Sequence, residues 1–586
     1  MRKPTIFACV VLALAMATPM TAASGAGNAG FKTAQPSMLT AVKSGVEITP
    51  ILTVGDVLPG GYRFESIPDG ISLRTKGGKA EVYVNHETSK VPFPFNVASP
   101  TPANGESDFD NAQVSKLALN KTSAGVLNAS FVIPSSAGFQ RFCSNYLATS
   151  AEGFDREILF TNEESPDYVF RQEDSWPPPL TNVGAEENGL VVALDVKSGN
   201  FQPIFGMGRH NHENSVPVPG LDNLFVMSGD DTFTSGPLTI PQPGPILDLQ
   251  RPAQSQLYSY LAADTDEVLA DDGELYAFVS DTTGFNDYYD FIPGSAMTIE
   301  GHFIQVPKNI ATGLNPDGTE MKAADVPAAQ GGPFPAPPSD GTWQRDLRSV
   351  APLGIDGPQW VLEYWSQLNN VFNFVRVEDI AYDKREGMSN TVYVVDSGRG
   401  TAGASQAGRS TNGRVWEMVL PDDPTVPGSV DLSIFVEGDD NPVQTPGEVH
   451  QPDNLETTAT GILVTEDPGS SQQFPFGSVD PNATTARLWY VPFIGTPEVV
   501  VKVDQSADSG PTDQDGRAAG NLGAWEASGI VDASAAFGPG AFLIDVQAHT
   551  LWVDRAPGTN NFGDAQADFT FKREGGQLLL LRIPGI

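Results

Sequence analysis

The pattern that decides the fold is the stretch Val82-Tyr83-Val84-Asn85-His86-Glu87, in which strand-forming residues run directly into an acidic residue. The same pattern recurs five more times, at residues 158–164, 224–231, 392–396, 462–467 and 542–545. Repetition of a short strand pattern is typical of architectures in which each unit buries its apolar face against the next. The sequence therefore predicts six related units.

Each copy of this pattern lies between two other elements. A second apolar run follows it, such as residues 113–117 after the first copy. Upstream, most copies are preceded by an acidic residue that leads into a strand: Asp69, Glu213, Glu378, Asp453 and Glu526. Three or four short antiparallel strands per unit, with 59 Gly and 48 Pro available for turns, predict an all-β fold. We expect a six-bladed β-propeller with long inserted loops at the channel mouth.

The innermost strands of a propeller line a central channel, so acidic residues at equivalent points of six blades would gather in one funnel. Carboxylates held that close repel one another unless cations neutralise them. Acidic residues also end strands simply as turn formers, and that alternative stays open. The pattern favours a site for hard cations with one softer transition metal.

The cysteines add to this expectation. Cys9 lies in the N-terminal segment described below, which leaves Cys143 as the one cysteine of the remaining chain. Cys143 stands 20 residues before Glu163, in the place where the sister units carry a carboxylate. A lone cysteine cannot form an internal disulfide, and many such residues are simply buried as small apolar groups. Its place in the repeat favours a metal ligand.

Charge and composition exclude several classes of function. The chain of 586 residues has 34 Lys and Arg against 72 Asp and Glu, a net charge of -38, and 40 % of its residues are apolar. That apolar content can bury a sizeable core, which argues against a disordered acidic chain. The negative charge disfavours binding to nucleic acid or to an anionic membrane surface. The sequence has no Gly-rich phosphate loop, no His-Glu-x-x-His and no Gly-x-Ser-x-Gly.

The first residues have the pattern of a secretory signal peptide. Arg2 and Lys3 precede an apolar run at residues 6–16, and small residues follow at 22–26. No later apolar run reaches the roughly 20 residues that a membrane span needs. We therefore expect an exported protein, periplasmic or extracellular, with a signal peptide at 1–26. A flexible linker at 27–47 and a propeller at 48–586 would follow, with an insertion at about 281–374.

Several stretches, taken in order, carry a family resemblance: Arg141-Phe142-Cys143, Thr161-Asn162-Glu163-Glu164, Gly208-Arg209-His210-Asn211-His212-Glu213, Ser228-Gly229-Asp230-Asp231 and Arg376-Val377-Glu378-Asp379. Together they resemble the PhoX family of exported alkaline phosphatases, over roughly residues 60 to 585. The resemblance implies a six-bladed propeller with a mixed cluster of Fe³⁺ and Ca²⁺ at the channel mouth. Residues 149–154 depart from the Thr-Pro-Trp-Gly-Thr stretch usual in the family, and the signal lacks the usual paired arginines.

The resemblance also implies roles for individual residues. Cys143 matches the cysteine that ligates iron, and Arg376 matches the arginine that holds the substrate phosphate. For Arg376 the alternative is a salt bridge to a neighbouring carboxylate. Of the glutamates at 163 and 164, either one could be the ligand. The metal ligands implied are Cys143, Glu163, Glu164, Glu213, Asp231, Glu378, Asp453 and Glu87.

The function implied is that of a phosphomonoesterase that acts on small-molecule phosphate esters, as a monomer. Two alternatives remain. One is a non-catalytic, calcium-binding propeller that serves as a binding or structural module. The other is a calcium-dependent, lactonase-like hydrolase, which would give Cys143 no role.

Overall fold

The computed structural model describes residues 29–65, 67–87, 111–165, 168–169, 186–232, 238–239, 250–251, 255–294, 296–337, 356–398, 412–438, 447–467, 484–505, 525–548, 553–554, 571–572 and 575–586. The expected signal peptide at 1–26 lies outside these ranges. Within them, no helix combines the length and the apolar content needed to cross a membrane.

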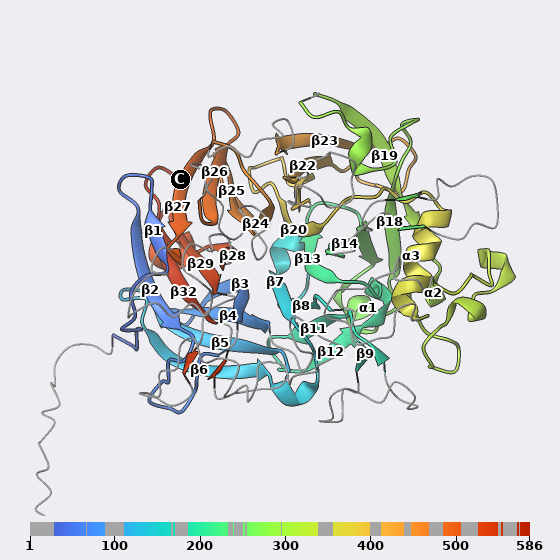
Figure 1. The fold of residues 1–586 in the computed structure, drawn as a ribbon. Coiled ribbons are helices and arrows are strands. Elements are labelled where there is room, and N and C mark those ends of the chain that lie inside the picture. The colour runs from blue at the N-terminus through green and yellow to red at the C-terminus, as the bar shows by residue number, and fades with distance from the viewer. Residues whose placement is uncertain are drawn as a thin grey trace, which may run out of the picture.

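Antiparallel sheets stand around a common centre in a propeller-like arrangement (Figure 1). Two four-stranded sheets come first along the chain. One consists of β3 (Ile67–Lys76), β4 (Lys79–Glu87), β5 (Gln113–Asn120) and β6 (Val126–Ile133). The other consists of β7 (Phe142–Ala148), β8 (Ile158–Glu163), β11 (Val191–Asp195) and β12 (Phe201–Ile204). In both, each strand pairs with the next large strand along the chain.

The middle of the chain forms a nine-stranded sheet. Its first strands in spatial order are β13 (His212–Val218), β14 (Leu224–Asp230), β17 (Leu257–Ala262), β18 (Glu274–Ser280) and β19 (Thr298–Gln305). The sheet continues with β23 (Val430–Glu437), β22 (Arg414–Val419), β21 (Thr391–Asp396) and β20 (Val377–Tyr382). β19 therefore joins two meanders that run in opposite order.

Two more sheets complete the arrangement. One consists of β24 (Pro452–Thr457), β25 (Gly461–Glu466), β26 (Arg487–Pro492), β27 (Glu498–Val503) and, at its outer edge, β1 (Leu39–Ala41). The last consists of β28 (Trp525–Asp532), β29 (Ala541–Ala548), β32 (Gly575–Arg582) and β2 (Glu47–Thr53).

The remaining elements are short. Two-stranded sheets form from β9 (Tyr168–Val169) with β10 (Glu186–Glu187), β15 (Leu238–Thr239) with β16 (Gln250–Arg251), and β30 (Val553–Asp554) with β31 (Phe571–Lys572). The α-helices are α1 (Thr265–Leu269), α2 (Lys308–Thr312), α3 (Pro358–Leu368) and α4 (Ser534–Phe537).

The all-β, propeller-like prediction is confirmed, and all six copies of the sequence pattern are strands. They are the second strands of their meanders: β4, β8, β14, β21, β25 and β29. Strands lie within two of the expected segments. Within the expected linker, residues 39–41 form β1, which pairs with β27 because that edge strand offers unpaired backbone groups. Within the expected insertion, residues 298–305 form β19, which pairs with both β18 and β23.

Apolar side chains fill the spaces between neighbouring sheets. Ile51, Val82 and Leu543, which come from two different sheets, share one cluster and are fully buried. Phe160 and Val226 likewise share a cluster that joins the sheet of β8 to the sheet of β14. Each sheet therefore buries its faces against its neighbours, which is why one unit alone would leave apolar surface in water.

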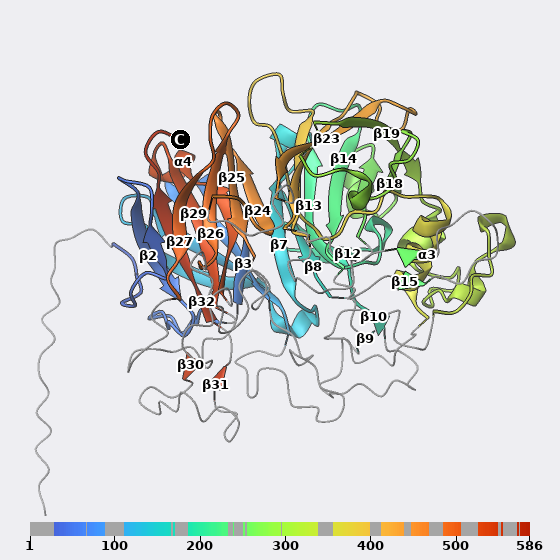
Figure 2. The ribbon, with the colours of Figure 1, turned by 45° about the horizontal axis from the view of Figure 1, so that its top comes forward.

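The start of the chain completes its last sheet. β2 pairs with β32 from Glu47 and Arg582 to Thr53 and Gln577, and the Gln577 side chain donates to Thr53 Oγ1 at 2.8 Å. Figure 2 shows β2 beside the strands from the C-terminal end of the chain. The ring of sheets is thus closed by pairing residues from opposite ends of the sequence.

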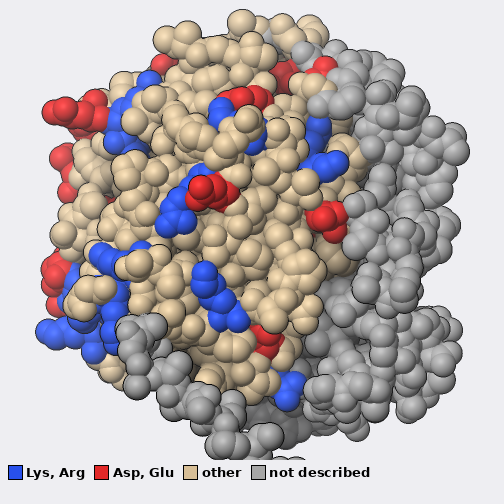
Figure 3. Space-filling model, turned by 90° about the vertical axis from the view of Figure 1, so that its left-hand side faces the viewer, with Lys and Arg blue, Asp and Glu red and all other residues tan. Residues whose placement is uncertain are grey.

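The excess of acidic residues is not concentrated on the face that these closing strands form. On that face, Lys and Arg side chains lie among Asp and Glu side chains, and most of the surface carries neither (Figure 3). Many carboxylates are buried in the interior instead, including Asp69, Glu213, Glu378 and Asp545. Buried carboxylates are rare unless they are paired or bound to cations.

Candidate metal centre

The acidic residues expected to converge lie on β-bulges. The pairing register of five innermost strands, β3, β7, β13, β20 and β24, shifts at the same point of each strand. The two residues inside each shift are Asp69-Gly70, Cys143-Ser144, Glu213-Asn214, Glu378-Asp379 and Asp453-Asn454. A bulge bends its strand and re-aims its side chains. The repeat therefore presents one candidate ligand per strand toward the centre.

Cys143 lies among carboxylates from three different elements. Its Sγ is 2.7 Å from Asp69 Oδ2 and 3.2 Å from Glu213 Oε1. Burial raises the pKa of the Cys143 thiol well above its usual value, and Asp69, Glu213, Glu164 and Glu87 raise it further. Without a cation this sulfur is a protonated thiol. A cation would reverse that, because a metal-bound thiol is deprotonated.

Three overlapping groups of side chains could each hold a metal ion. Within each group the ligand atoms lie within 4.8 Å of one another. The groups are Asp69 with Glu87 and Cys143, then Cys143 with Glu164 and Glu213, then Glu213 with Glu378 and Asp453. Because Cys143 and Glu213 each belong to two groups, the three groups form one continuous cluster of oxygen and sulfur ligands.

The electrostatics of this cluster favour bound cations. Burial raises the pKa of Glu213 well above its ordinary value, and Glu378, Glu164, Asp69 and Asp453 raise it further. Burial also raises the pKa values of Glu378 and Asp453 well above the ordinary range. Like charges at this spacing cannot all ionise in the absence of counter-charge. The residues present therefore fit hard cations bound through oxygen, with one softer ion at the sulfur.

Arg376 forms ion pairs with three carboxylates beside the cluster. Its Nε and Nη2 donate to the two oxygens of Asp231 at 2.7 and 2.8 Å. Nη2 is also 3.0 Å from Glu378, and Nη1 is 3.6 Å from Asp467. The salt bridge considered for Arg376 is thus present. Asp231 joins none of the three metal groups of the described chain, since its carboxylate faces this guanidinium.

The structure separates the two glutamates that the sequence left equivalent. Glu164 lies in the group with Cys143 and Glu213. Glu163 instead accepts hydrogen bonds from the backbone N–H groups of Gln140 and Leu190, at 2.9 and 3.2 Å. Its carboxylate fixes two backbone segments, and Glu164 is the candidate ligand of the pair.

Three acidic residues of this region were missing from the predicted ligand set. Asp69 contacts Cys143 directly, Asp467 lies near Arg376, and Glu526 shares electrostatic repulsion with Asp467 and Asp453. Asp69 occupies the same bulge position as Glu213, so the spacing identifies it, whereas Glu526 lies three residues before the bulge at Gly529. Asp467 follows Glu466 as Glu164 follows Glu163, which is a second usable signal.

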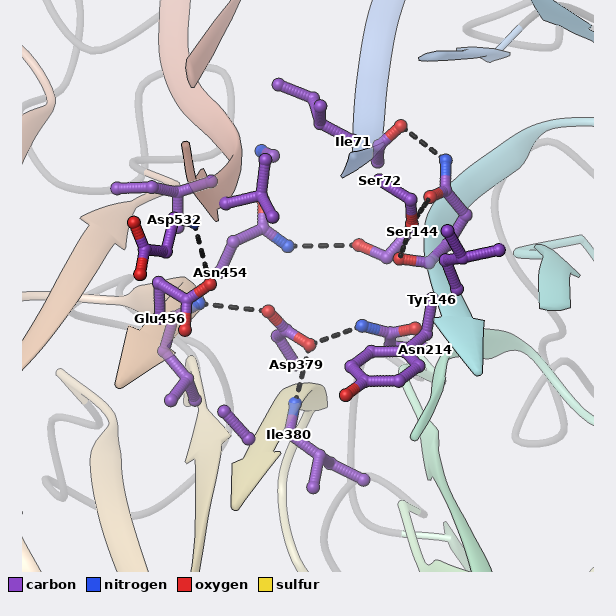
Figure 4. Close-up of a pocket in the computed structure, with 18 of the residues that line it drawn as sticks. Ile71, Ser72, Ser144, Tyr146, Asn214, Asp379, Ile380, Asn454, Glu456 and Asp532 are labelled. Carbon is purple, nitrogen blue, oxygen red and sulfur yellow. Dashed lines mark hydrogen bonds between the residues drawn. The ribbon is translucent and has the colours of Figure 1, made fainter. Parts of the chain in front are cut away.

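A pocket of ≈ 260 Å³ is lined by residues that follow the candidate ligands in sequence, and Figure 4 shows it. The second residue of each bulge lines it: Gly70, Ser144, Asn214, Asp379 and Asn454. Asn454 Nδ2 donates to Ser144 Oγ at 3.0 Å, and Ser144 Oγ donates to Glu213 Oε1 at 2.9 Å. The wall shared by the pocket and the cluster is therefore a layer of hydrogen-bonded polar side chains.

Comparisons with known proteins add little to this geometry. No family model and no curated protein matches the chain. Among solved structures, a glycosyl hydrolase from Bacteroides ovatus matches at 10 % identity, over 78 % of this chain and 90 % of that one, with a TM-score of 0.25. The Pyrococcus horikoshii acylaminoacyl peptidase matches at 8 % identity, over 75 % of this chain and 53 % of that one, with a TM-score of 0.21. Likenesses this weak carry no argument about substrate or reaction.

Proposed function

We propose that this chain is a PhoX-like exported phosphomonoesterase, which releases phosphate from small organic phosphate esters at an iron and calcium cluster. The observation that carries the proposal is the position of Cys143, whose sulfur lies among Asp69, Glu87, Glu164 and Glu213 in two overlapping candidate metal groups. A structural cysteine would pack among apolar side chains. One thiolate within a set of carboxylates is a donor set that suits iron together with calcium.

We also infer six blades. The nine-stranded sheet divides naturally into a meander of β13, β14, β17 and β18 and a second meander of β20 to β23, bridged by β19. Each meander then has the same four-strand order as the other sheets. Each also begins with an innermost strand that carries a bulged acidic residue or Cys143, except β28, whose bulge falls at Gly529.

The ligands would divide into two neighbouring sets. Cys143, Glu164 and Glu213 would hold the iron, with Asp69 and Glu87 beside them. A second set, which shares Glu213 with the first, would hold calcium: Glu213, Glu378 and Asp453. The chemistry supplied by bound Fe³⁺ and Ca²⁺ would be Lewis acidity at a phosphate oxygen and neutralisation of the anionic substrate.

Arg376 would orient the substrate. Asp231 holds its guanidinium through Nε and Nη2, which fixes the plane of the group. Nη1 lies 3.6 Å from Asp467, farther than Nε and Nη2 lie from the oxygens of Asp231. We assign Nη1 to the contact with a phosphate oxygen, because its separation from Asp467 is longer than a charge-assisted hydrogen bond.

One observation favours the second candidate, a calcium-binding propeller without catalysis. Arg376 is 7 % exposed and already faces Asp231, Glu378 and Asp467. A guanidinium used only to offset these carboxylates would have the same surroundings. The two candidates differ in iron content and in turnover.

The deciding experiment measures iron, calcium and p-nitrophenyl phosphate hydrolysis on one sample of purified protein. The phosphatase proposal expects iron and calcium together with turnover. Cys143→Ala should lose iron and most activity while the fold persists. As a matched pair, Glu164→Gln should lower metal content, whereas Glu163→Gln should leave it unchanged. Calcium without iron or turnover would instead support the binding module, and unchanged iron in Cys143→Ala would remove this residue from the site.

A further inference from the structure

Two contacts beside the cluster join the same two positions of different repeats. Asp231 directly follows β14, and its carboxylate accepts hydrogen bonds from Arg376. Asp467 directly follows β25, and its carboxylate hydrogen-bonds to the side chain of Glu526. Arg376 and Glu526 in turn each stand four residues before the point at which the strand register resumes after the bulge. The repeat therefore builds the same pair twice, once from an acid and a cation and once from two acids.

The pair of two acids holds a proton. Two carboxyl groups can hydrogen-bond to each other only if one of them is protonated, because ionised carboxylates have no donor. Burial raises the pKa of Glu526 well above its ordinary value, and the charges of Asp467 and Asp453 raise it further. In the other pair the guanidinium of Arg376 supplies the donors, and a guanidinium is not deprotonated in proteins. The proton shared by Asp467 and Glu526 can therefore be transferred, whereas those of the other pair cannot.

This proton lies beside the place assigned to the substrate phosphate. Asp467 Oδ2 is 3.6 Å from Nη1 of Arg376, the nitrogen assigned to a phosphate oxygen. The Asp467 side chain is 14 % exposed, whereas the side chains of Asp231 and Glu378, which contact the same guanidinium, are 1 % and 3 % exposed. Of these three carboxyl groups, Asp467 is thus the one most open to a bound ester. A proton on it would also remove the repulsion between a carboxylate and the anionic phosphate.

The pair is also separate from the candidate metal ligands. Among the described residues, the three metal groups include neither Asp467 nor Glu526. Cations bound in those groups therefore need not displace the shared proton. An acid with a transferable proton beside a phosphate-binding arginine is suited to protonating a leaving group.

We propose that Asp467 is the general acid of the phosphatase reaction, and that Glu526 is a positioning residue that keeps the shared proton on the pair. An oxygen from water forms a bond to phosphorus, and the bond from phosphorus to the ester oxygen breaks. The electron pair of that bond stays on the ester oxygen, which takes the proton from Asp467 and leaves as an alcohol. Of the two protons of the water, one stays on the phosphate and the other restores the pair. This role rests on the proposed phosphomonoesterase function.

The test compares two esters whose leaving groups differ in acidity. Phenol is a weaker acid than p-nitrophenol, so the departure of phenol depends more on a proton donor. Asp467→Asn should lower kcat on phenyl phosphate about 100-fold or more, the size of a general-acid contribution, and kcat on p-nitrophenyl phosphate far less. Asp231→Asn is the matched control, because Asp231 has the same repeat position but serves only to hold Arg376. It should lower the turnover of both esters by the same factor.

Glu526→Gln provides an independent variant. The amide can still donate a hydrogen bond to Asp467, but it supplies no transferable proton. This variant should repeat the selective loss on phenyl phosphate while its iron and calcium content stays at the wild-type level. Should Asp467→Asn fail to fold, Glu526→Gln decides the question by the same measurements.

The outcomes separate this role from the function on which it rests. Equal losses on the two esters, or no loss on either, would overturn the general-acid role and leave the phosphatase function in place. Absence of turnover on both esters in the wild type would overturn the phosphatase function, and the general-acid role with it.

Discussion

Several repeats place buried acidic residues at two positions, and their surroundings differ. The first position is the end of the second strand, as in Glu163, Asp396 and Glu466. Asp396, for example, accepts hydrogen bonds from the backbone N–H groups of Val375, Arg376 and Gly398 at 3.0 to 3.1 Å. Glu466 accepts from the backbone of His450 and from the side chains of Arg487 and Trp489.

The second position is the bulge of the innermost strand, as in Asp69, Glu213 and Glu378. Here the neighbours include other carboxylates and Cys143, and hydroxyl groups of Ser144, Ser397 and Ser528 donate to Glu213, Glu378 and Asp69. Glu378 also pairs with Arg376. The strand-end acids Glu163, Asp396 and Glu466 therefore accept more N–H hydrogen bonds than the bulge acids Asp69 and Glu213. The supply of N–H donors, rather than burial, separates carboxylates that hold the backbone from carboxylates that are suited to cations.

The largest effect should follow from removing a strand-end acid. Glu466→Ala leaves the buried Arg487 guanidinium without its partner, which sits 2.7 Å away. Breaking such a pair costs about 3–5 kcal/mol of stability. Urea unfolding measures the loss. Glu498→Ala, which removes a partly exposed pair with Lys43, is the control and should cost less than about 1 kcal/mol. Equal losses in the two variants would contradict the comparison.

Replacing a bulge acid should raise the stability of the metal-free protein, whereas replacing a strand-end acid lowers stability. Glu213→Gln replaces a buried carboxyl group, whose ionisation is opposed by burial and by Glu378, Glu164, Asp69 and Asp453, with a neutral amide. The chelated variant should therefore be more stable than chelated wild type. We expect a higher melting temperature for the chelated variant than for chelated wild type. The same variant should bind less metal. The matched strand-end variant Glu163→Gln should lose stability in chelator and keep its metal content, and thermal melts with elemental analysis test both.

The pH dependence should reverse with metal content. In the metal-free fold, burial raises the pKa of Asp379 to about 7, and burial raises that of Asp396 to about 6. A folded-state pKa above the unfolded value of about 4 gives stabilisation that is complete below pH 4. That stabilisation is lost as the pH rises through 6 and 7.

Chelated protein should therefore melt at a higher temperature at pH 5 than at pH 8. Metal-loaded protein should melt higher at pH 8, because cations displace protons from their ligands. Scanning calorimetry at both pH values, with and without chelator, checks the signs. A chelated protein that is more stable at pH 8 would mean that the buried carboxylates are compensated by something other than cations.

The smallest effect concerns the layer between the cluster and the pocket. Ser144→Ala removes the hydroxyl that donates to Glu213 and accepts from Asn454. Loss of such a supporting hydrogen bond weakens metal affinity by about 10- to 100-fold. Ser72→Ala is a control in the same pocket, since Ser72 bonds to Asn145 rather than to a candidate ligand. Metal competition titrations should show a change for Ser144 only.

The sequence predicted the strands and the repeat position of the candidate ligands, because both follow from local patterns. The copy at 82–87 is β4, and Cys143 lies on a bulge with the same register as Glu213. The sequence could not distinguish Glu163 from Glu164 as a ligand. The N–H groups that donate to the Glu163 carboxylate belong to Gln140 and Leu190, in two other segments of the chain.

The pairing of β2 with β32 has a consequence for how the molecule is assembled. Thr53 and Gln577 are 524 positions apart in sequence, so their contact must wait until almost the whole chain is available. Contacts of such long range form slowly, since the entropy of the intervening loop opposes them. We expect the pairing of β2 with β32 to form late and to limit the folding rate. Separation of β2 from β32 would then limit the unfolding rate. Resistance to proteases would therefore depend on one seven-residue strand, Glu47–Thr53.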